Sequence, residues 1–540
     1  MKDLIIVSDF HLGEGRRDKK RYAPTEDFFH DEDFARFLKY IRKLYAGRPE
    51  DLVLVFNGDI FDFLTVTTIP SESIAAQMGF HITTAEKRFG LNATAAKSVF
   101  KLNVIAKGHP EFFKAISRFI ADGFHLEFIR GNHDLELYFP EVRRRFIEIL
   151  ASVRGGATWQ QLMQQVRFHQ LFYREAGRIH IEHGHQYDAT NSNRFPLNPV
   201  FVRKHKIGNE EIEEETLDYP IGSVFVKYFY NRVRRFDPYA PRLISPEQYV
   251  DFVRRYNVFD VWRVYKDHYP YFIAALSPST NVGAGEFTRT EKKQHESEDQ
   301  AVAAKAGYGE FYHEWEKMKV SPEPANKAAV VKKAMAPVVR RGLWAGVFAF
   351  SVLYLWILFF TLIQEIPWLA ANAFIMSIFA ALSIFGVFWV WSHFRSKLNH
   401  WNFRERDQAK EAAAKLAHLS DARVFVFGHT HHIDNATIND NGVVYANSGS
   451  WTTVANPWSR IERDARRLTF ALVQGTDVEL KRWNRDGERF DQVPLFAIDT
   501  EAEAIIHAEV VDDDFSNCRE HSWLPGAMVD PDTEQEDEYE

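Results

Sequence analysis

Residues 56–62 read Phe-Asn-Gly-Asp-Ile-Phe-Asp, and they follow the apolar run Leu-Val-Leu-Val at residues 52–55. A short, β-branched-rich run that is bounded by a glycine predicts a buried strand. Asp59 then lies where the strand ends and a loop begins, which is a common position for functional residues in α/β folds. A single aspartate decides little, so its meaning depends on the residues at the ends of the other apolar runs.

Four further polar motifs each follow an apolar run of the same kind. They are Asp-Phe-His at 9–11, Gly-Asn-His-Asp at 131–134, His-Gly-His at 183–185 and Gly-His-Thr-His at 428–431. Together with the Asp59 segment, and in this order, they resemble the motif pattern of the metallophosphoesterase (calcineurin-like phosphoesterase) superfamily. The resemblance covers residues 1 to about 190 and about 418 to 455.

The residue types in these motifs suit the hydrolysis of a phosphoester. The charge of a phosphate repels hydroxide, so hydrolysis near neutral pH needs cations, and two divalent ions roughly 3.5–4 Å apart can screen the charge and acidify a water. Oxygen and imidazole ligands suit manganese, which we favour, and also iron, zinc or magnesium. A structural zinc site is disfavoured because the only cysteine, Cys518, is far from every motif in the sequence.

The resemblance implies seven metal ligands. One ion would be held by the Asp-x-His motif and the last histidine, the other by the asparagine and two histidines, and an aspartate with two oxygens would bridge both. In chain order the ligands would be Asp9, His11, Asp59, Asn132, His183, His429 and His431. The catalytic pair would be His133, as electrostatic stabiliser or proton donor to the leaving oxygen, and Asp134, which would orient it.

Each motif also has a structural interpretation. A lone Asp-x-His or Gly-Asn-His-Asp is often an ordinary turn. His185 and Asp62 are interpreted as partners of the ligands or of the substrate, and the polar residues 186–194 as substrate-binding groups or as plain loop. The joint occurrence of five motifs, each after a strand-like run, favours the metal site.

The resemblance implies an α/β fold, the metallophosphoesterase two-sheet sandwich flanked by helices. Apolar residues at helical spacing predict helices at 32–45, 111–121 and 141–150, on the outside of the sheets. Residues 1–199 and 406–500 would form the two parts of this domain, followed by an acidic tail at 501–540.

Residues 200–330 form an insertion that lies outside the motif pattern. Residues 222–236 combine aromatic and cationic side chains, which on a helix suits either a cap packed on the catalytic domain or a membrane surface with anionic lipid. The polar residues 283–300, of mixed charge, predict a mobile loop.

Two segments, residues 343–363 and 366–391, contain no charged side chain. Each is long enough to cross a hydrocarbon core as a helix, which takes about 20 residues. Basic residues flank both outer ends and are missing from the turn, so the positive-inside rule places both ends in the cytoplasm. We expect a transmembrane hairpin within residues 331–405, through which the chain could also form oligomers; the alternative is a buried helical pair in a soluble core.

Composition narrows the classes of partner and compartment. The net charge of -8 gives no overall cationic surface, so no nucleic-acid partner is expected. One cysteine excludes an intramolecular disulfide and fits a reducing compartment. Because the first residues lead directly into a strand, no signal peptide is expected, and the inner membrane with the catalytic domain in the cytoplasm is the expected location.

We therefore expect a membrane-anchored dimetal phosphoester hydrolase that acts on a phosphate- or pyrophosphate-bearing lipid or lipid precursor by attack of a metal-bound hydroxide. The bacterial UDP-diacylglucosamine hydrolases are similar in fold and setting, but they carry arginine where this chain has His133 and lack a hairpin. Two alternatives stay open: an anchored phosphatase or phosphodiesterase for a soluble nucleotide or phosphoprotein, and a non-catalytic membrane scaffold with a relic metal site.

Overall fold

A computed structural model describes the chain over residues 1–18, 21–207, 210–231, 288–320, 401–438, 442–452 and 468–493, with isolated residues between 351 and 361. Met1–Val493 form one compact unit, and the second unit, Pro494–Glu540, lies outside the described residues. The predicted spans at 343–363 and 366–391 also lie outside them, apart from the isolated residues. Within the described ranges, none of the helices combines the length and apolar character that a membrane span requires.

The first sheet has seven strands in the order β14-β13-β12-β1-β2-β3-β4. Four neighbouring strands run parallel, and the three closing strands run antiparallel to their neighbours. The bounds are β1 (Asp3–Val7), β2 (Leu52–Asn57), β3 (His125–Ile129), β4 (Val166–His169), β12 (Thr469–Gln474), β13 (Asp477–Asn484) and β14 (Arg489–Gln492). The predicted strand before Asp59 is therefore a central strand of this sheet.

The second sheet has five strands in the order β10-β11-β9-β6-β5. The three inner strands are parallel and both edge strands are antiparallel. The bounds are β5 (Phe172–Glu175), β6 (Ile179–Glu182), β9 (Val424–Phe427), β10 (Asp434–Thr437) and β11 (Val444–Asn447). Strands β6 and β9 pair directly although the whole insertion separates them in the sequence.

The two sheets share one apolar core. Side chains alternate between the faces of a strand, and one face of each inner strand contributes to this cluster. It contains Leu4, Ile6, Val53, Val55 and Ile129 from the first sheet and Ile179, Ile181, Val424, Val426 and Ala446 from the second. Burial on both faces explains why these strands read as continuous apolar runs.

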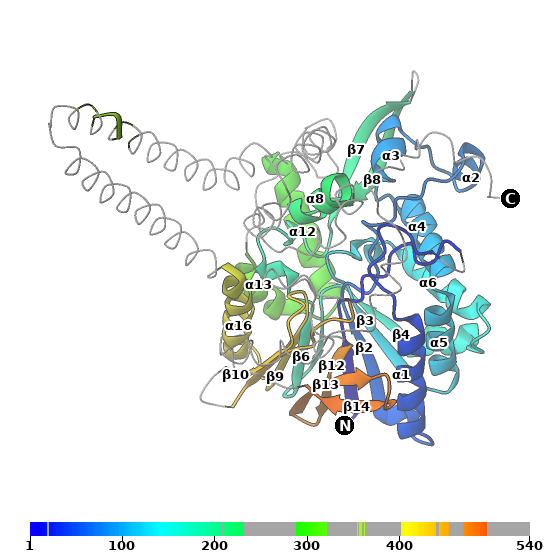
Figure 1. Cartoon of the computed structure of the whole chain (residues 1–540), viewed down its shortest axis with the longest axis vertical. Coiled ribbons are helices and arrows are strands. Elements are labelled where there is room, and N and C mark those ends of the chain that lie inside the picture. The colour runs from blue at the N-terminus through cyan, green and yellow to red at the C-terminus, as the bar shows by residue number, and fades with distance from the viewer. Residues whose placement is uncertain are drawn as a thin grey trace. The chain divides into compact units, whose positions relative to one another are not determined.

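Helices cover the outer face of the first sheet (Figure 1). They are α1 (Asp31–Leu44), α4 (Ala95–Gly108), α5 (Pro110–Ala121) and α6 (Pro140–Ser152). The layer between these helices and the sheet is rich in aromatic side chains. Phe34 stacks on Phe112 with ring centroids 4.7 Å apart, and Phe10 stacks on Trp451 at 4.8 Å. Trp451 follows β11, so it brings the last part of the domain into the core of the first part.

The outer face of the second sheet packs against α12 (Arg289–Lys305), α13 (Gly309–Met318) and α16 (Trp401–Leu419) (Figure 1). The expectation of a mobile loop at 283–300 is wrong for the described residues 288–300, which begin α12. Thr288 and Glu291 form a capping box at its start, and Asp299 and Ala303 are buried. Because few residues of this helix are buried, its sequence lacks the apolar periodicity that would predict a helix.

The described part of the insertion packs on the domain. It begins with a two-stranded hairpin, β7 (Val200–Ile207) and β8 (Glu210–Leu217), followed by α8 (Ile221–Phe225) and the turn η4 (Val226–Tyr230). Val224 and Tyr228 join the main core, and the buried Lys227 donates to Leu91 O at 2.6 Å. These contacts are those of a cap, over residues 221–230; residues 232–236 lie outside the described ranges.

The remaining short elements lie in the connections between the strands and helices described above. They are α2 (Glu72–Gln77), α3 (Thr84–Phe89) and α7 (Trp159–Gln165), with single turns η1 (Pro49–Asp51), η2 (Leu135–Tyr138) and η3 (His185–Tyr187).

Candidate metal centre

The five motifs meet because parallel strands end at the same edge of a sheet. Asp9, Asp59 and Asn132 follow β1, β2 and β3, which are neighbours in parallel register. His183 and His429 follow β6 and β9, which are parallel neighbours in the second sheet. Since the sheets pack face to face, the two sets of strand ends form one site.

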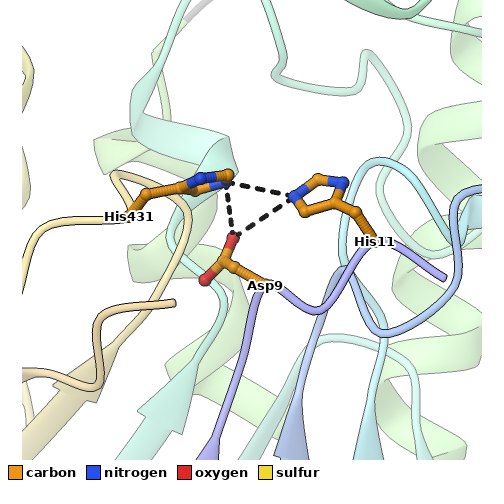
Figure 2. A group of neighbouring side chains, drawn as sticks. All are labelled: Asp9, His11 and His431. Atoms are coloured by element: carbon orange, nitrogen blue, oxygen red, sulfur yellow. Dashed lines mark hydrogen bonds and ion pairs between the residues drawn. The ribbon is translucent and has the colours of Figure 1, made fainter. Parts of the chain in front are cut away.

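The first group of side chains is Asp9, His11 and His431 (Figure 2). His431 Nε2 lies 3.2 Å from Asp9 Oδ1 and 3.1 Å from His11 Nε2, and His11 Nε2 lies 3.9 Å from the same carboxylate oxygen. Both rings point their Nε2 atoms at the carboxylate, as ligands of a single ion would.

The carboxylate of Asp9 is held so that one oxygen faces this group. Its Oδ2 atom accepts hydrogen bonds from the Ser8 hydroxyl and from the backbone N–H of His429, the latter at 3.1 Å. Its Oδ1 atom is buried and has no hydrogen-bond partner among the described residues. A buried acceptor without a donor costs free energy unless a cation or water satisfies it.

The second group is Asp59, His183 and His429. Asp59 Oδ2 lies 3.1 Å from His183 Nε2 and 3.9 Å from His11 Nε2, so this oxygen stands between the two groups. Asp59 Oδ1 accepts from the backbone N–H of His133 at 2.8 Å. The position between both groups is the one that a bridging carboxylate requires.

Neighbouring atoms also orient the remaining predicted ligands. His183 Nδ1 donates to Asn57 O at 2.8 Å, which leaves its Nε2 atom, 3.1 Å from Asp59 Oδ2, for an ion. Asn132 Nδ2 donates to Asn191 Oδ1 at 3.4 Å, and Asn132 Oδ1 is buried without a hydrogen-bond partner among the described residues. Asp188 Oδ2 lies 3.2 Å from His429 Nε2.

Five of the predicted ligands have backbones in the left-handed region. The φ angles are 55° at Asp9, 54° at His11, 53° at Asp59, 66° at His429 and 57° at His431. Residues other than glycine adopt this conformation rarely and at a cost, and such residues cluster at functional sites. The backbone strain is thus concentrated at the strand ends that build the centre.

Two glycines allow the close approach of these strand ends. A Cβ atom at Gly131 would lie 2.1 Å from Asp59 Oδ1, and one at Gly58 would lie 2.5 Å from the ring of His183. Any larger residue at either position would displace a predicted ligand.

The structure corrects the role expected for Asp134. Its carboxylate accepts from the backbone N–H groups of Gly131, at 2.6 Å, and Ile60, at 2.9 Å, so it ties two strand-end loops together. An oxygen of Asp62 contacts the ring of His133: Asp62 Oδ2 lies 3.0 Å from His133 Nδ1 and 3.5 Å from His11 Nδ1. Sequence reasoning assigned the role to the nearer residue along the chain.

Burial and mutual charge shift the acidities of the centre. Burial alone would raise the pKa of Asp59, but the charge of His183, and then that of His133, holds it well below the usual range. Burial likewise disfavours a charged His183, yet Asp59 raises the pKa of that ring to about 10. Burial, aided by the charge of Asp59, raises the pKa of Asp134 to about 7. The buried carboxylate of Asp59 is therefore kept ionised by cationic neighbours.

His185 takes the position of a supporting residue. It is buried, its Nε2 atom lies 3.2 Å from Asn193 Oδ1, and its ring centroid is 5.4 Å from that of His183. Burial, and then the charge of His183, holds its pKa well below the usual range.

The donor set fits a pair of divalent ions. Carboxylate, amide and imidazole atoms converge, none of the described residues contributes a thiol, and the buried Oδ1 atoms of Asp9 and Asn132 are without hydrogen-bond partners within the described chain. The structure brings all seven predicted ligands to one edge of the sandwich. Asp188 and Asn191 contact two of these ligands, and the sequence does not predict these contacts because turn residues leave no periodic signal.

Comparison with known proteins finds a family model that matches the first part of the chain. Residues 3–262 match the calcineurin-like phosphoesterases, a dimetal-dependent family of hydrolases. The match includes four of the five motifs and ends before His429 and His431, which the fold brings to the same site. No curated protein matches the chain.

Proposed function

We propose that this metal-dependent phosphoesterase, which carries a calcineurin-like phosphoesterase domain, is anchored in a membrane and hydrolyses a phosphate or pyrophosphate bond of a lipid or lipid precursor. The proposal of hydrolysis is supported by five strand-end motifs that converge on one buried set of carboxylates and imidazoles. The proposal of a membrane anchor is supported by the two charge-free segments at 343–363 and 366–391.

The chain's own residues supply binding, orientation and a proton. Two divalent ions, for which we propose manganese, screen the phosphate and acidify a water when they are bound. His133 is the proton donor in this proposal, because Asp62 Oδ2 lies 3.0 Å from its Nδ1 atom and can orient the ring, which leaves Nε2 for the leaving oxygen of a substrate. The side chain of His133 is 17 % exposed against 1 % for Asp62, so it lies on the side from which a substrate can approach.

Two described elements support an anchor that leaves and re-enters the domain at one place. Helix α13 precedes the charge-free segments, α16 follows them, and the two helices pack against each other on the second sheet. A chain that departs after α13 and returns into α16 suits a hairpin. Basic residues on both flanks favour the cytoplasmic face of the inner membrane, with both termini in the cytoplasm and no nucleic-acid partner.

The lipid substrate and the soluble substrate differ in the role that they require of the hairpin. A phosphatase for a nucleotide or phosphoprotein would use the hairpin only as an anchor, whereas a lipid hydrolase needs its substrate presented at the bilayer surface. Phosphorus NMR therefore tests the proposal: membrane phospholipids and nucleotide-linked lipids in detergent are incubated with manganese-loaded protein and with Asn132→Ala.

The proposal predicts loss of one lipid phosphorus signal with the wild type and none with Asn132→Ala. Unchanged lipid signals together with manganese-dependent hydrolysis of a soluble phosphodiester would overturn the lipid substrate and retain the hydrolase. Unchanged signals for both substrate classes would favour the scaffold with a relic site.

A further inference from the structure

The turn after β6, residues 188–191, contacts predicted ligands that come from different sheets. Asp188 Oδ2 lies 3.2 Å from Nε2 of His429, which follows β9 in the second sheet. Asn191 Oδ1 accepts from Nδ2 of Asn132, which follows β3 in the first sheet, at 3.4 Å. His429 and Asn132 are the ligands predicted for the same ion, so one turn reaches both sides of that ion's site.

The two turn residues are fixed to each other. Asn191 Nδ2 donates to Asp188 Oδ2 at 2.6 Å, and the backbone and hydroxyl of Thr190 both donate to Asp188 Oδ1 at 2.9 Å. The side-chain amide of Asn191 therefore donates to the aspartate and accepts from Asn132. A continuous chain of contacts runs from the imidazole of His429 through Asp188 and Asn191 to the amide of Asn132.

This chain of contacts determines which atoms remain for an ion. Because Asn132 donates through Nδ2, its Oδ1 atom is turned toward the site, where it is buried and lacks a hydrogen-bond partner in the described part of the chain. A carboxylate beside an imidazole restricts the ring's orientation and raises its basicity as a ligand. The contacts of the turn thus hold the side chains of Asn132 and His429 in orientations that suit the binding of an ion.

The insertion closes over the same turn from two directions. Gly222 N, at the start of α8, donates to Thr190 O at 2.9 Å, and a Cβ at Gly222 would lie 2.3 Å from Asn191 Oδ1. Beyond α13, Val320 N donates to Gln186 O at 2.9 Å, and Lys319 Nζ donates to Arg194 O at 2.6 Å. Residues before and after the turn are therefore held by elements outside the two sheets.

We propose that Asp188 and Asn191 are positioning residues for the ion held by Asn132, His183 and His429, and that the insertion holds them in place. This inference rests on the proposed dimetal site. Removing Asp188 releases the ring of His429 and one anchor of Asn191, so it weakens one of the two ions selectively. The contacts of the turn within the described chain run to Asn132 and His429 rather than to the group of Asp9, His11 and His431.

Cobalt binding provides a readout that does not depend on turnover. The metal-free full-length protein is titrated with Co²⁺ while the visible absorption and the bound metal per chain are recorded. Wild type is expected to bind two ions. Asp188→Ala is expected to bind one ion with unchanged affinity and the other about 10–100-fold more weakly. Asn191→Ala is expected to give a smaller loss at the same ion, because its contact with Asn132 is long.

The control is Asp421→Asn, which changes a 61 % exposed carboxylate away from the centre and should bind both ions as wild type does. Asp188→Asn keeps the volume of the side chain and covers the case in which the alanine variant does not fold. Wild-type affinity for both ions in Asp188→Asn and Asn191→Ala would overturn the positioning role while the dimetal site stands. Failure of the wild type itself to bind two ions would overturn the proposed site as well.

Discussion

The two sheets contribute to the candidate metal centre in different ways. The first sheet supplies Asp9, Asp59 and Asn132 from three adjacent parallel strands that also follow one another in the sequence. The second sheet supplies His183 and His429 from adjacent strands that the insertion separates in the sequence. Pairing of β6 with β9, rather than proximity in the chain, therefore determines which histidines reach the site.

The largest effect on metal binding and activity is expected at Asp59, which lies between the two groups of predicted ligands. Asp59→Asn removes the charge from the oxygen that lies between His183 and His11. We expect loss of both ions and a decrease in kcat/KM on the order of a thousandfold, because the two ions share this ligand. Metal analysis and the rate of phosphodiester hydrolysis measure the effect, and near-normal binding of two ions would show that the sheets do not meet through Asp59.

The next largest effect is a loss of stability where Trp451 packs the last part of the domain against the first. Trp451 is fully buried, stacks on Phe10 and donates its backbone N–H to Asp9 O at 3.2 Å. Trp451→Ala should lower the free energy of unfolding by about 3–5 kcal/mol through the cavity it leaves. Denaturant unfolding of the metal-free protein measures this. A loss below about 1 kcal/mol, typical of surface sites, would contradict the packing.

A buried ionic network in the first part of the chain should make its stability depend on pH. His109 lies 3.0 Å from Asp31 Oδ2 and 3.3 Å from Glu26 Oε2, and although burial opposes the charged ring, Glu26 and Asp31 raise its pKa to about 10. The folded pKa exceeds the usual value near 6.5. The stabilisation is therefore complete below that value and is lost as pH rises toward 10, with a slope of about 1.4 kcal/mol per pH unit.

Unfolding measured between pH 6.5 and 10 in wild type and in His109→Gln isolates this contribution. The variant should be less stable near neutral pH and should show a flatter dependence on pH. Parallel curves for the two proteins would contradict a charged His109.

The smallest effect concerns an ion pair on the second sheet. Lys410 of α16 lies 2.7 Å from Asp434 of β10, and both side chains are partly exposed. Solvent screening should limit the cost of Asp434→Asn to about 0–1 kcal/mol. A thermal melt is sufficient to measure it, and a cost above about 2 kcal/mol would mean that this pair is as important as the buried network of the first part.

Patterns in the sequence predicted the elements that carry their signal locally. The apolar runs before Asp9, Asp59, Asn132, His183 and His429 are strands, and the amphipathic segments at 32–45, 111–121 and 141–150 correspond to α1, α5 and α6. These residues face a core in a fixed period, so the pattern survives in the sequence.

Features that depend on long-range contacts could not be predicted in this way. The orientation of His133 by Asp62 rather than by Asp134 depends on how two loops approach each other. The helix at Arg289–Lys305 has few buried residues, so its polar sequence gives no strong period. The contacts of Asp188 with His429 become visible only once β6 and β9 pair.

We propose one centre, built from both sheets, that binds two ions and hydrolyses phosphoesters. Bound manganese per chain and the rate of hydrolysis of a simple phosphodiester, measured for the wild type and for His431→Ala, test this proposal. The wild type should bind two ions and turn over, and the variant should keep only one ion and lose activity. Two bound ions and full activity in the variant would overturn the proposal of one shared centre, because the site would then not need the second sheet's last motif.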